Sequence, residues 1–206
     1  ISDVTARDGL QSLGKILSLK QKEMLISDLS KCGFDEIEVG SLVNYDIIPS
    51  MANSLNLYEL FRNKKKISKM NQFYPNYYLL VGNNSGINLV NKNKICHISF
   101  FTSPSDTFNL KNINSTREES FIKLEEMISN IEDRESMYIK GYLSCIGSCP
   151  YEGDVPIGKI VDSVVKFKDI GVNEICLADT IGDLKKEKLE DIFCLLYTSP
   201  SPRDDE

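Results

Sequence analysis

Apolar and polar residues alternate along this chain with two distinct periods. Short runs rich in β-branched and aromatic residues predict strands, and each run is followed by a segment whose apolar residues recur at helical spacing. We expect a first strand that ends at Asp3 or Val4, and then strands at residues 36–39, 77–81, 95–101, 137–144 and 174–178. Strands and helices therefore take turns along the sequence.

Three of the helical segments have clear boundaries. Residues 19–31 place apolar side chains along one face and stop at Cys32-Gly33, and residues 157–170 end at Gly171. Residues 115–130 begin with Ser115 as the expected N-cap and Glu118 in the matching capping-box position. The pattern thus predicts a helix after most strands.

Strict alternation of strands and helices requires parallel pairing, because each strand returns to the sheet through a right-handed crossover. The fold class is therefore α/β. An open doubly wound sheet normally carries a Gly-rich phosphate loop after its first strand, whereas residues 5–11 read Thr-Ala-Arg-Asp-Gly-Leu-Gln. This favours a TIM (β/α)8 barrel. Because 206 residues are few for a closed barrel, we expect one truncated after about six βα units.

Composition narrows the classes of partner. The net charge is −6 and the lysines are scattered, which argues against nucleic acid. No apolar run approaches the roughly 18 residues that a membrane span needs, so we expect no membrane partner. Most of the six cysteines lie in apolar strands or on a helix, as free thiols of a reducing compartment do. Cys145 and Cys149 are spaced more loosely than a C-x-x-C site, and packing beside a turn is an equal alternative.

The last residues break the pattern. A helix is expected to begin near Lys185, and from Cys194 onward Ser-Pro repeats replace its periodicity. A flexible natural C-terminus is one interpretation. However, residues 194–204 match the conceptual translation of a transposase sequencing adapter. We therefore expect the genuine domain to occupy residues 1–193, with native sequence missing on both sides, and residues 194–206 to be a library artefact.

Polar residues stand where the first two predicted strands end. In a barrel these ends form the active face. Arg7 and Asp8 follow the first strand, with Gln11 close behind. They form either a structural salt bridge, or a divalent-metal ligand beside a guanidinium that stabilises negative charge on a substrate. Glu38 and Ser41 end the second strand, and Glu38 either bridges to Arg7 or serves the chemistry directly.

Four motifs together carry a family resemblance. Residues 141–153 read Gly-Tyr-Leu-Ser-Cys-Ile-Gly-Ser-Cys-Pro-Tyr-Glu-Gly, and residues 7–11, 111–121 and 179–182 supply the other three. In this order, from Ile1 to about Phe193, they resemble the 3-hydroxy-3-methylglutaryl-CoA lyase family. The Cys-Pro-Tyr-Glu-Gly run is close to family-specific.

The resemblance implies a TIM-barrel metallolyase that splits 3-hydroxy-3-methylglutaryl-CoA into acetoacetate and acetyl-CoA, using Mg²⁺ or Mn²⁺. It also implies a role in leucine breakdown and ketone-body formation in the mitochondrial matrix, with the cytoplasm or peroxisome as alternatives, and a homodimer. Asp8 would be a metal ligand, and Arg7 would stabilise the enolate, with Glu38 and Asp179 also catalytic. The substrate-binding residues would be Arg7, Gln11, Ser41, Lys140, Tyr142 and Asn112, the last in a loop near the CoA portion.

Several positions depart from the family pattern. The chain has Lys140 where arginine is usual, Cys176 for serine, Ala178 for glycine and Asn53 for aspartate. The family's His-x-His and Asn metal ligands and its mobile-loop Cys would lie beyond Phe193. His97, the single histidine, sits in an apolar strand and is expected to be a core residue.

We therefore expect these 206 residues alone to be inactive. The alternatives are a related Claisen-type synthase or hydroxy-acid aldolase, which share the Arg-Asp pair, and a non-catalytic remnant.

Overall fold

The computed structural model describes residues 1–67 and 74–198. Six parallel strands form one sheet in the order β1-β2-β3-β4-β5-β8. Their bounds are β1 Ser2–Asp3, β2 Glu36–Leu42, β3 Asn76–Val81, β4 His97–Thr102, β5 Tyr138–Ser144 and β8 Glu174–Ala178. These are the six strands that the sequence predicts. A short antiparallel hairpin, β6 Ser148–Cys149 with β7 Gly153–Asp154, was not expected.

Helices separate the strands. They are the π-helix η1 Thr5–Gly9, α1 Leu19–Leu29, the 3-10 helix η2 Pro49–Met51, α2 Ser54–Ile67, α3 Asn84–Asn93, α4 Asp106–Ile113, α5 Arg117–Ser129, α6 Ile157–Asp169 and α7 Lys186–Thr198. The helix that was expected to lose its periodicity at Cys194 continues to Thr198. The remaining tail, residues 199–206, lies outside the described residues, and the proposed boundary at Phe193 stays a prediction.

The capping box of α5 differs from the expectation by one residue. The Thr116 N–H donates to Glu119 Oε2 at 2.8 Å, and the Glu119 N–H donates to Thr116 Oγ1 at 3.3 Å. Ser115 and Glu118 were therefore the wrong pair. Both registers fit the S/T-x-x-E pattern, so the sequence alone does not distinguish them. None of the helices in the described part of the chain is long and apolar enough to cross a membrane.

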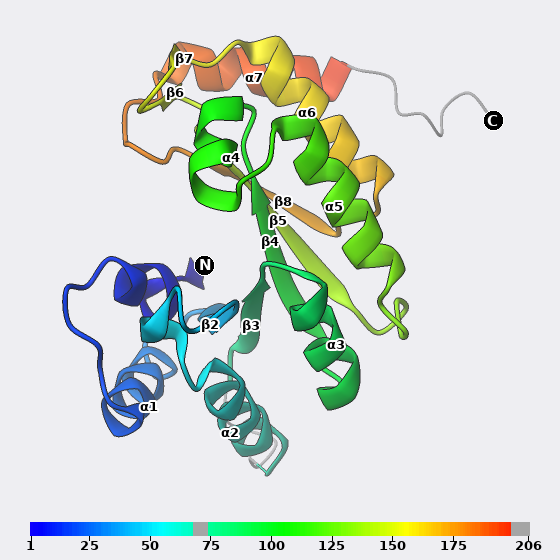
Figure 1. The fold of residues 1–206 in the computed structure, drawn as a ribbon. Coiled ribbons are helices and arrows are strands. Elements are labelled where there is room, and N and C mark those ends of the chain that lie inside the picture. Colours follow the sequence, from blue (N-terminus) through cyan, green and yellow to red (C-terminus); the bar gives the residue numbers. More distant parts are fainter. Residues whose placement is uncertain (68–73, 199–206) are drawn as a thin grey trace. The chain divides into compact units, whose positions relative to one another are not determined.

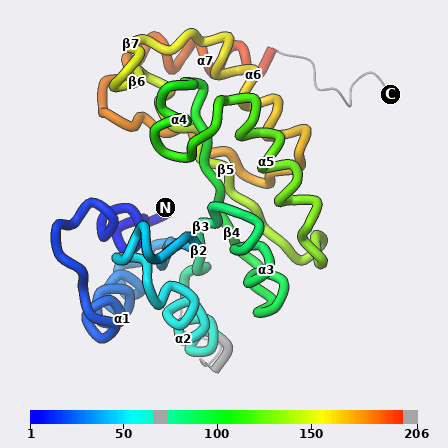
Figure 2. The backbone as a smooth tube through the Cα atoms, viewed as in Figure 1, coloured from blue at the N-terminus to red at the C-terminus, as the bar shows by residue number. Residues whose placement is uncertain are grey.

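The chain divides into two compact units. The first comprises Ile1–Ser99 with Asn130–Tyr138, and the second comprises Phe100–Ser129 with Ile139–Glu206. In the first unit α2 packs on β2 and β3, and α1 lies beside α2 (Figure 1). Ile26, Ile37 and Leu79 are fully buried in its core. In the second unit α6 and α7 run side by side (Figure 2).

Strand β2 contains a bulge that positions the candidate site. Glu38 pairs with Tyr78 and Gly40 pairs with Leu79, so Val39 is an extra residue in β2. Paired residues of parallel strands point to the same face, and side chains alternate along β3. The bulge therefore places Glu38 and Ser41 on the same face of β2, although they are three residues apart.

Contacts on both faces of β2 agree with this register. Ser41 pairs with Leu80, and Leu80 pairs with Ser99, whose hydroxyl donates to Glu38. On the other face, a Cβ added at Gly40 would lie 2.2 Å from Ser54 Oγ at the start of α2. Only glycine allows α2 to approach β2 this closely.

Candidate active site

Arg7 and Asp8 lie in η1, directly beyond the carboxyl end of β1. The N–H groups of Arg7, Asp8 and Gly9 all converge on the Val4 carbonyl oxygen, at 3.1, 2.8 and 3.4 Å. Wide turns of this kind occur frequently at functional sites. The turn packs against β2 and so brings the first two predicted groups of site residues together within the first unit.

Arg7 donates to Glu38, Asp8 and Gln11. Its Nε donates to Glu38 Oε2 at 2.5 Å, and its Nη1 donates to Asp8 Oδ1 at 2.7 Å and to Gln11 Oε1 at 3.4 Å. Of the two alternatives left open for Glu38, the bridge to Arg7 is the one observed. The side chains are exposed to very different degrees: 1% for Glu38, 13% for Arg7 and 62% for Asp8. Glu38 therefore lies behind Arg7, and Asp8 reaches toward solvent.

This arrangement suits a guanidinium that stabilises developing negative charge. Arg7 cannot lose its proton, and the buried Glu38 carboxylate fixes the direction in which the guanidinium plane points. A donor that is already oriented, and shielded from water, stabilises charge more strongly than a mobile one. The structure thus places a preorganised cation at the end of β1.

Ser41 is the most enclosed of the predicted substrate-binding residues. It is fully buried, and its N–H donates to Ser54 Oγ at 3.1 Å. Its own Oγ has no hydrogen-bond partner among the described residues. The hydroxyl shares a face with Glu38, but it is not exposed in this structure, so direct substrate binding by Ser41 stays a prediction.

The described residues do not complete a metal site. Asp8 offers a carboxylate, and residues 1–67 and 74–198 contain no group of three His, Cys, Asp or Glu side chains able to hold an ion. Mg²⁺ and Mn²⁺ prefer six ligand atoms, most of them oxygens, so the carboxylate of Asp8 alone does not make a metal site.

The His97 side chain packs against aromatic rings, as predicted for a lone histidine in an apolar strand. Its ring lies 5.2 Å from that of Tyr78 and 6.2 Å from that of Tyr138. Burial lowers the pKa of His97, and Lys65 lowers it further.

In the second unit, Asp179 organises the loop that follows β8. Its Oδ1 accepts the N–H groups of Gly182 at 3.0 Å and Asp183 at 3.2 Å, and its Oδ2 accepts that of Leu184 at 3.0 Å. Thr180 Oγ1 accepts the Cys145 N–H at 2.8 Å. The observed role of Asp179 is to hold this loop, and its predicted catalytic role remains a prediction.

Lys140 and Tyr142 share one face of β5. A Cβ at Gly141, between them, would meet the Phe167 ring of α6 at 2.9 Å, so the two side chains point to the opposite face. Lys140 is buried, and its Nζ lies 3.0 Å from Glu174 Oε1 on β8. The lysine thus retains the charge expected at this position and uses it in an ion pair.

Asn112 does not lie in a loop, which corrects the expectation. It belongs to the last turn of α4, where its Nδ2 donates to the Phe108 carbonyl at 2.8 Å. The side chain is exposed. The family resemblance suggested a loop, but the Ser105 side chain caps the helix at its start and accepts the Phe108 N–H.

The Cys-Pro-Tyr-Glu-Gly run makes the turn of the β6–β7 hairpin and forms hydrogen bonds to the start of α4. Cys149 Sγ accepts the Ser105 hydroxyl at 3.0 Å, and Glu152 Oε1 accepts the Thr107 N–H at 2.7 Å. This last bond lowers the pKa of Glu152. The Lys111 ammonium lies over the Tyr151 ring, 4.8 Å from its centroid.

Cys145 and Cys149 are both buried beside this turn, which is the packing alternative that the sequence left open. Cys145 has a positive φ of 62°, and burial raises the pKa of its thiol. A buried thiol with a raised pKa is a poor nucleophile.

Two residues that the sequence did not single out contact the predicted motifs. Lys188 of α7 donates to the carbonyl oxygens of Gly147 at 2.5 Å and Val155 at 2.6 Å. Ser99 donates to Glu38 in the first unit. Neither a lysine in an amphipathic helix nor a serine in an apolar strand has a distinguishing sequence signal.

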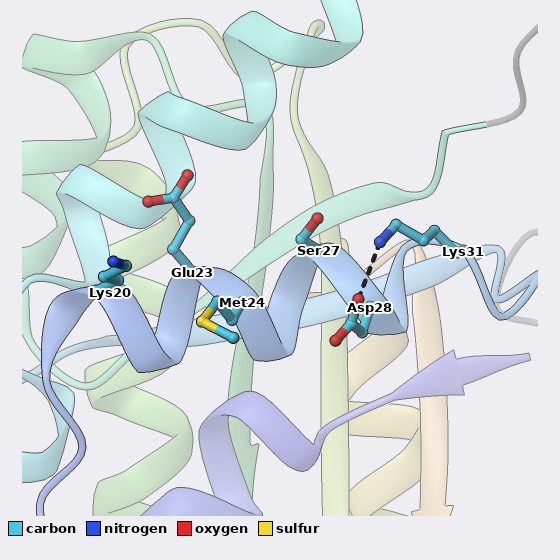
Figure 3. A pocket seen from close by; sticks show the side chains of 6 residues that line it. All are labelled: Lys20, Glu23, Met24, Ser27, Asp28 and Lys31. Carbon is cyan, nitrogen blue, oxygen red and sulfur yellow. Dashed lines mark hydrogen bonds and ion pairs between the residues drawn. The ribbon is translucent and has the colours of Figure 1, made fainter.

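A shallow hollow of about 350 Å³ lies on the exposed face of α1 (Figure 3). Its lining side chains come from α1 and from Lys31 just beyond the end of this helix, and Asp28 pairs with Lys31 at 2.9 Å. None of the predicted site residues contributes to it. The lining residues are Lys20, Glu23, Met24, Ser27, Asp28 and Lys31.

Comparison with known families settles the relationship of the chain. The family model described as HMGL-like matches residues 1–203. The chain belongs to the HMGL-like family.

Two curated relatives give the scale of similarity. The chain is 30% identical over 182 residues to the 3-hydroxy-3-isohexenylglutaryl-CoA/hydroxy-methylglutaryl-CoA lyase of Pseudomonas aeruginosa, with 87% of the chain and 57% of the relative covered. It is 33% identical over 184 residues to the mitochondrial hydroxymethylglutaryl-CoA lyase of Homo sapiens, with 88% of the chain and 53% of the relative covered. The chain thus spans a little over half the length of these relatives.

Solved structures confirm the fold. The HMG-CoA lyase of Brucella melitensis superimposes with a TM-score of 0.82 at 29% identity, covering 97% of this chain and 68% of the other. An HMG-CoA lyase from Acinetobacter baumannii in complex with coenzyme A and 3-methylmalate gives 0.81 at 26% identity, covering 97% and 63%. The predicted TIM-barrel fold, present here as six βα units, is therefore correct.

Proposed function

We propose that the protein to which this chain belongs cleaves 3-hydroxy-3-methylglutaryl-CoA to acetoacetate and acetyl-CoA. The observation that carries the proposal is Arg7 at the end of β1, oriented by buried Glu38 and flanked by exposed Asp8. Membership of the HMGL-like family and the names of the curated relatives support it.

The chemistry matches what Arg7 offers. When the tertiary hydroxyl of the substrate loses its proton, the bond between C2 and C3 breaks and its electron pair moves onto the thioester, forming an enolate. Acetoacetate leaves, and the enolate of acetyl-CoA takes up a proton at carbon. The charge on the thioester oxygen is greatest between these two steps. A fixed guanidinium that donates to this oxygen lowers the barrier.

In this proposal Glu38 acts through Arg7. At 1% exposure its carboxylate lies behind the guanidinium, so it orients Arg7 rather than touching the substrate. Gln11, whose carbonyl oxygen accepts from Arg7, is also assigned to substrate binding. The remaining assignments to the acyl-CoA, which are Ser41, Asn112, Lys140, Tyr142 and catalytic Asp179, rest on the family resemblance.

We assign Asp8 to a divalent cation, Mg²⁺ or Mn²⁺, because its carboxylate is exposed beside Arg7. When bound, such a cation lowers the pKa of a coordinated substrate hydroxyl. Asp8 supplies one ligand, and the described residues offer no complete set.

The acyl substituent, the oligomer and the compartment are the finer parts of the proposal. The Pseudomonas aeruginosa relative is named for a substrate with an isohexenyl group as well as the methyl one, so both acyl-CoA esters are candidates. Relatives are named mitochondrial in Homo sapiens and cytoplasmic in Mus musculus. We propose the mitochondrial matrix and a homodimer.

The decisive experiment measures acetyl-CoA release from 3-hydroxy-3-methylglutaryl-CoA by the complete protein, in wild-type form and as Arg7→Lys. Lysine keeps the charge but lacks the planar set of N–H donors with which the guanidinium binds Glu38 and Asp8 at the same time. We therefore expect kcat to fall by about 100- to 1,000-fold. Arg62→Lys is the matched control. Arg62 donates to the carbonyls of Asn93 and Lys94, which a lysine also satisfies, so it should retain full activity. Equal activity of both variants would remove Arg7 from the mechanism.

A further inference from the structure

Ser99 contacts Glu38, the partner of Arg7, from a strand that carries no predicted site residue. It lies in β4, is fully buried, and donates its hydroxyl to Glu38 Oε1. In the sequence it stands inside the apolar run His-Ile-Ser-Phe-Phe-Thr, with no partner visible. The parallel register, in which Leu80 pairs with both Ser41 and Ser99, brings it onto the face that Glu38 occupies.

The two oxygens of Glu38 have different donors. Oε2 accepts from Arg7 Nε and Oε1 accepts from Ser99 Oγ. A carboxylate held at one oxygen can turn about its last side-chain bond, whose rotation is soft. A carboxylate held at both oxygens cannot. The plane of Glu38 is therefore fixed by Ser99, and Glu38 in turn fixes the guanidinium plane of Arg7.

We propose that Ser99 is a positioning residue for the lyase reaction: its hydroxyl holds Glu38 so that Arg7 points at the thioester oxygen. This inference rests on the proposed function. Preorganised donors are effective because they need not reorient as charge develops. Loss of the Ser99 hydroxyl leaves Arg7 charged and near the substrate, but no longer restrained in direction.

The test compares Ser99→Val with Ser99→Thr in the complete protein. Valine and threonine have nearly the same shape, and only threonine keeps a hydroxyl. A hydrogen bond to a charged group corresponds to roughly a 10- to 100-fold change in an equilibrium or rate. We expect kcat of Ser99→Val to lie at least about tenfold below that of Ser99→Thr, with KM values within about twofold of each other. Melting temperatures of both variants show whether the fold is equally retained.

A second comparison separates positioning from a structural effect. In an Arg7→Lys background there is no guanidinium plane to orient, so the ratio of kcat between the Ser99→Thr and Ser99→Val variants should fall to about one. A merely structural role would give the same ratio in both backgrounds. Equal kcat of the two single variants, or an unchanged ratio in the Arg7→Lys background, would overturn the proposal.

Failure of the proposed function would be recognised separately. If the wild-type protein turned over no 3-hydroxy-3-methylglutaryl-CoA, the function would fall, and crystal structures of the two complete variants would decide the inference about Ser99. We expect Ser99→Thr to keep the orientation of the Glu38 carboxylate plane and of the Arg7 guanidinium plane, and Ser99→Val to change both. Unchanged orientations of these two planes in Ser99→Val would contradict the inference.

Discussion

Two ionisable side chains of the first unit, Glu38 and Lys22, are buried, a third, His97, is half-buried, and each has specific partners. Glu38 is held by Arg7 and Ser99, Lys22 by the carbonyl oxygens of Ser50 and Ala52, and His97 lies among aromatic rings. A buried charge that loses its partner is far more costly than an exposed one. Single replacements at these residues should therefore have large effects.

His97 should make stability depend on pH near neutrality. Burial and Lys65 lower the pKa of His97, while Glu36 opposes them. The folded state then binds its proton less readily than the unfolded state, whose pKa is about 6.5. The contribution of His97 to the free energy of unfolding is complete above pH 6.5 and is lost as the pH falls below it. We expect urea midpoints of the complete protein to drop between pH 7.5 and 5.5.

The control for this prediction is His97→Phe, which retains a ring beside Tyr78 and Tyr138 but does not titrate. Its urea midpoint should change less over the same pH range. Identical slopes for the two proteins would show that His97 contributes nothing to the pH dependence.

Side-chain roles were only partly predictable at this scale. The sequence offered the Arg7–Glu38 pair as one of two alternatives, because residues at the ends of neighbouring parallel strands meet at one edge. Ser99 did not, because its function depends on register across three strands. Asn112 was misplaced, because the short helix α4 is fixed by capping and by contacts from Cys149 and Glu152 rather than by its own propensity.

At the scale of elements, Lys22 ties helix α1 to the segment that leads into α2. Its Nζ donates to Ser50 O at 2.5 Å and Ala52 O at 2.9 Å, and burial lowers the pKa of this lysine. The segment then enters α2 through Asn53, which has a φ of 70°. The buried ammonium thus fixes the chain around η2.

Lys22→Met should destabilise the protein by about 2–4 kcal/mol, because two enclosed carbonyl groups lose a charged donor. Lys20→Met is the matched control, since Lys20 lies on the same helix and is exposed; it should change the free energy of unfolding by less than about 0.5 kcal/mol. Chemical denaturation of the complete protein measures both. Equal stabilities of the two variants would show that the Lys22 contacts are not important.

Element types were predicted well, and their internal irregularities were not. All six strands follow from apolar runs and alternation. The bulge at Val39 has no sequence signal, because Glu-Ile-Glu-Val-Gly-Ser-Leu reads equally well as a regular strand. The two-residue strands of the β6–β7 hairpin are too short to show a period.

At the scale of the whole molecule, the alternation of strands and helices predicted a parallel α/β fold, because right-handed crossovers leave few other arrangements. The barrel was favoured over an open doubly wound sheet because no Gly-rich phosphate loop follows the first strand. The boundary of the native sequence is a different question. Helix α7 continues through Cys194 to Thr198, so helical structure alone does not mark the junction that the adapter-like residues suggest.

Sequencing genomic DNA across the codons for Phe193 and Cys194 would test that boundary. We expect the native reading frame to depart from this chain after Phe193 and to continue into a strand with a His-x-His motif. The same region read from a transcript serves as the control for splicing. Genomic codons for residues 194–206 followed by a stop would refute the adapter interpretation and favour a non-catalytic remnant.

The bulge in β2 also affects how this chain should be aligned with other proteins. Because Val39 is an extra residue, the two halves of the strand are out of phase with each other. A relative with a regular strand would need a one-residue gap at this point. An ungapped alignment would equate Ser41 with a residue that points into the helical layer, and a substrate contact would be transferred to the wrong side chain.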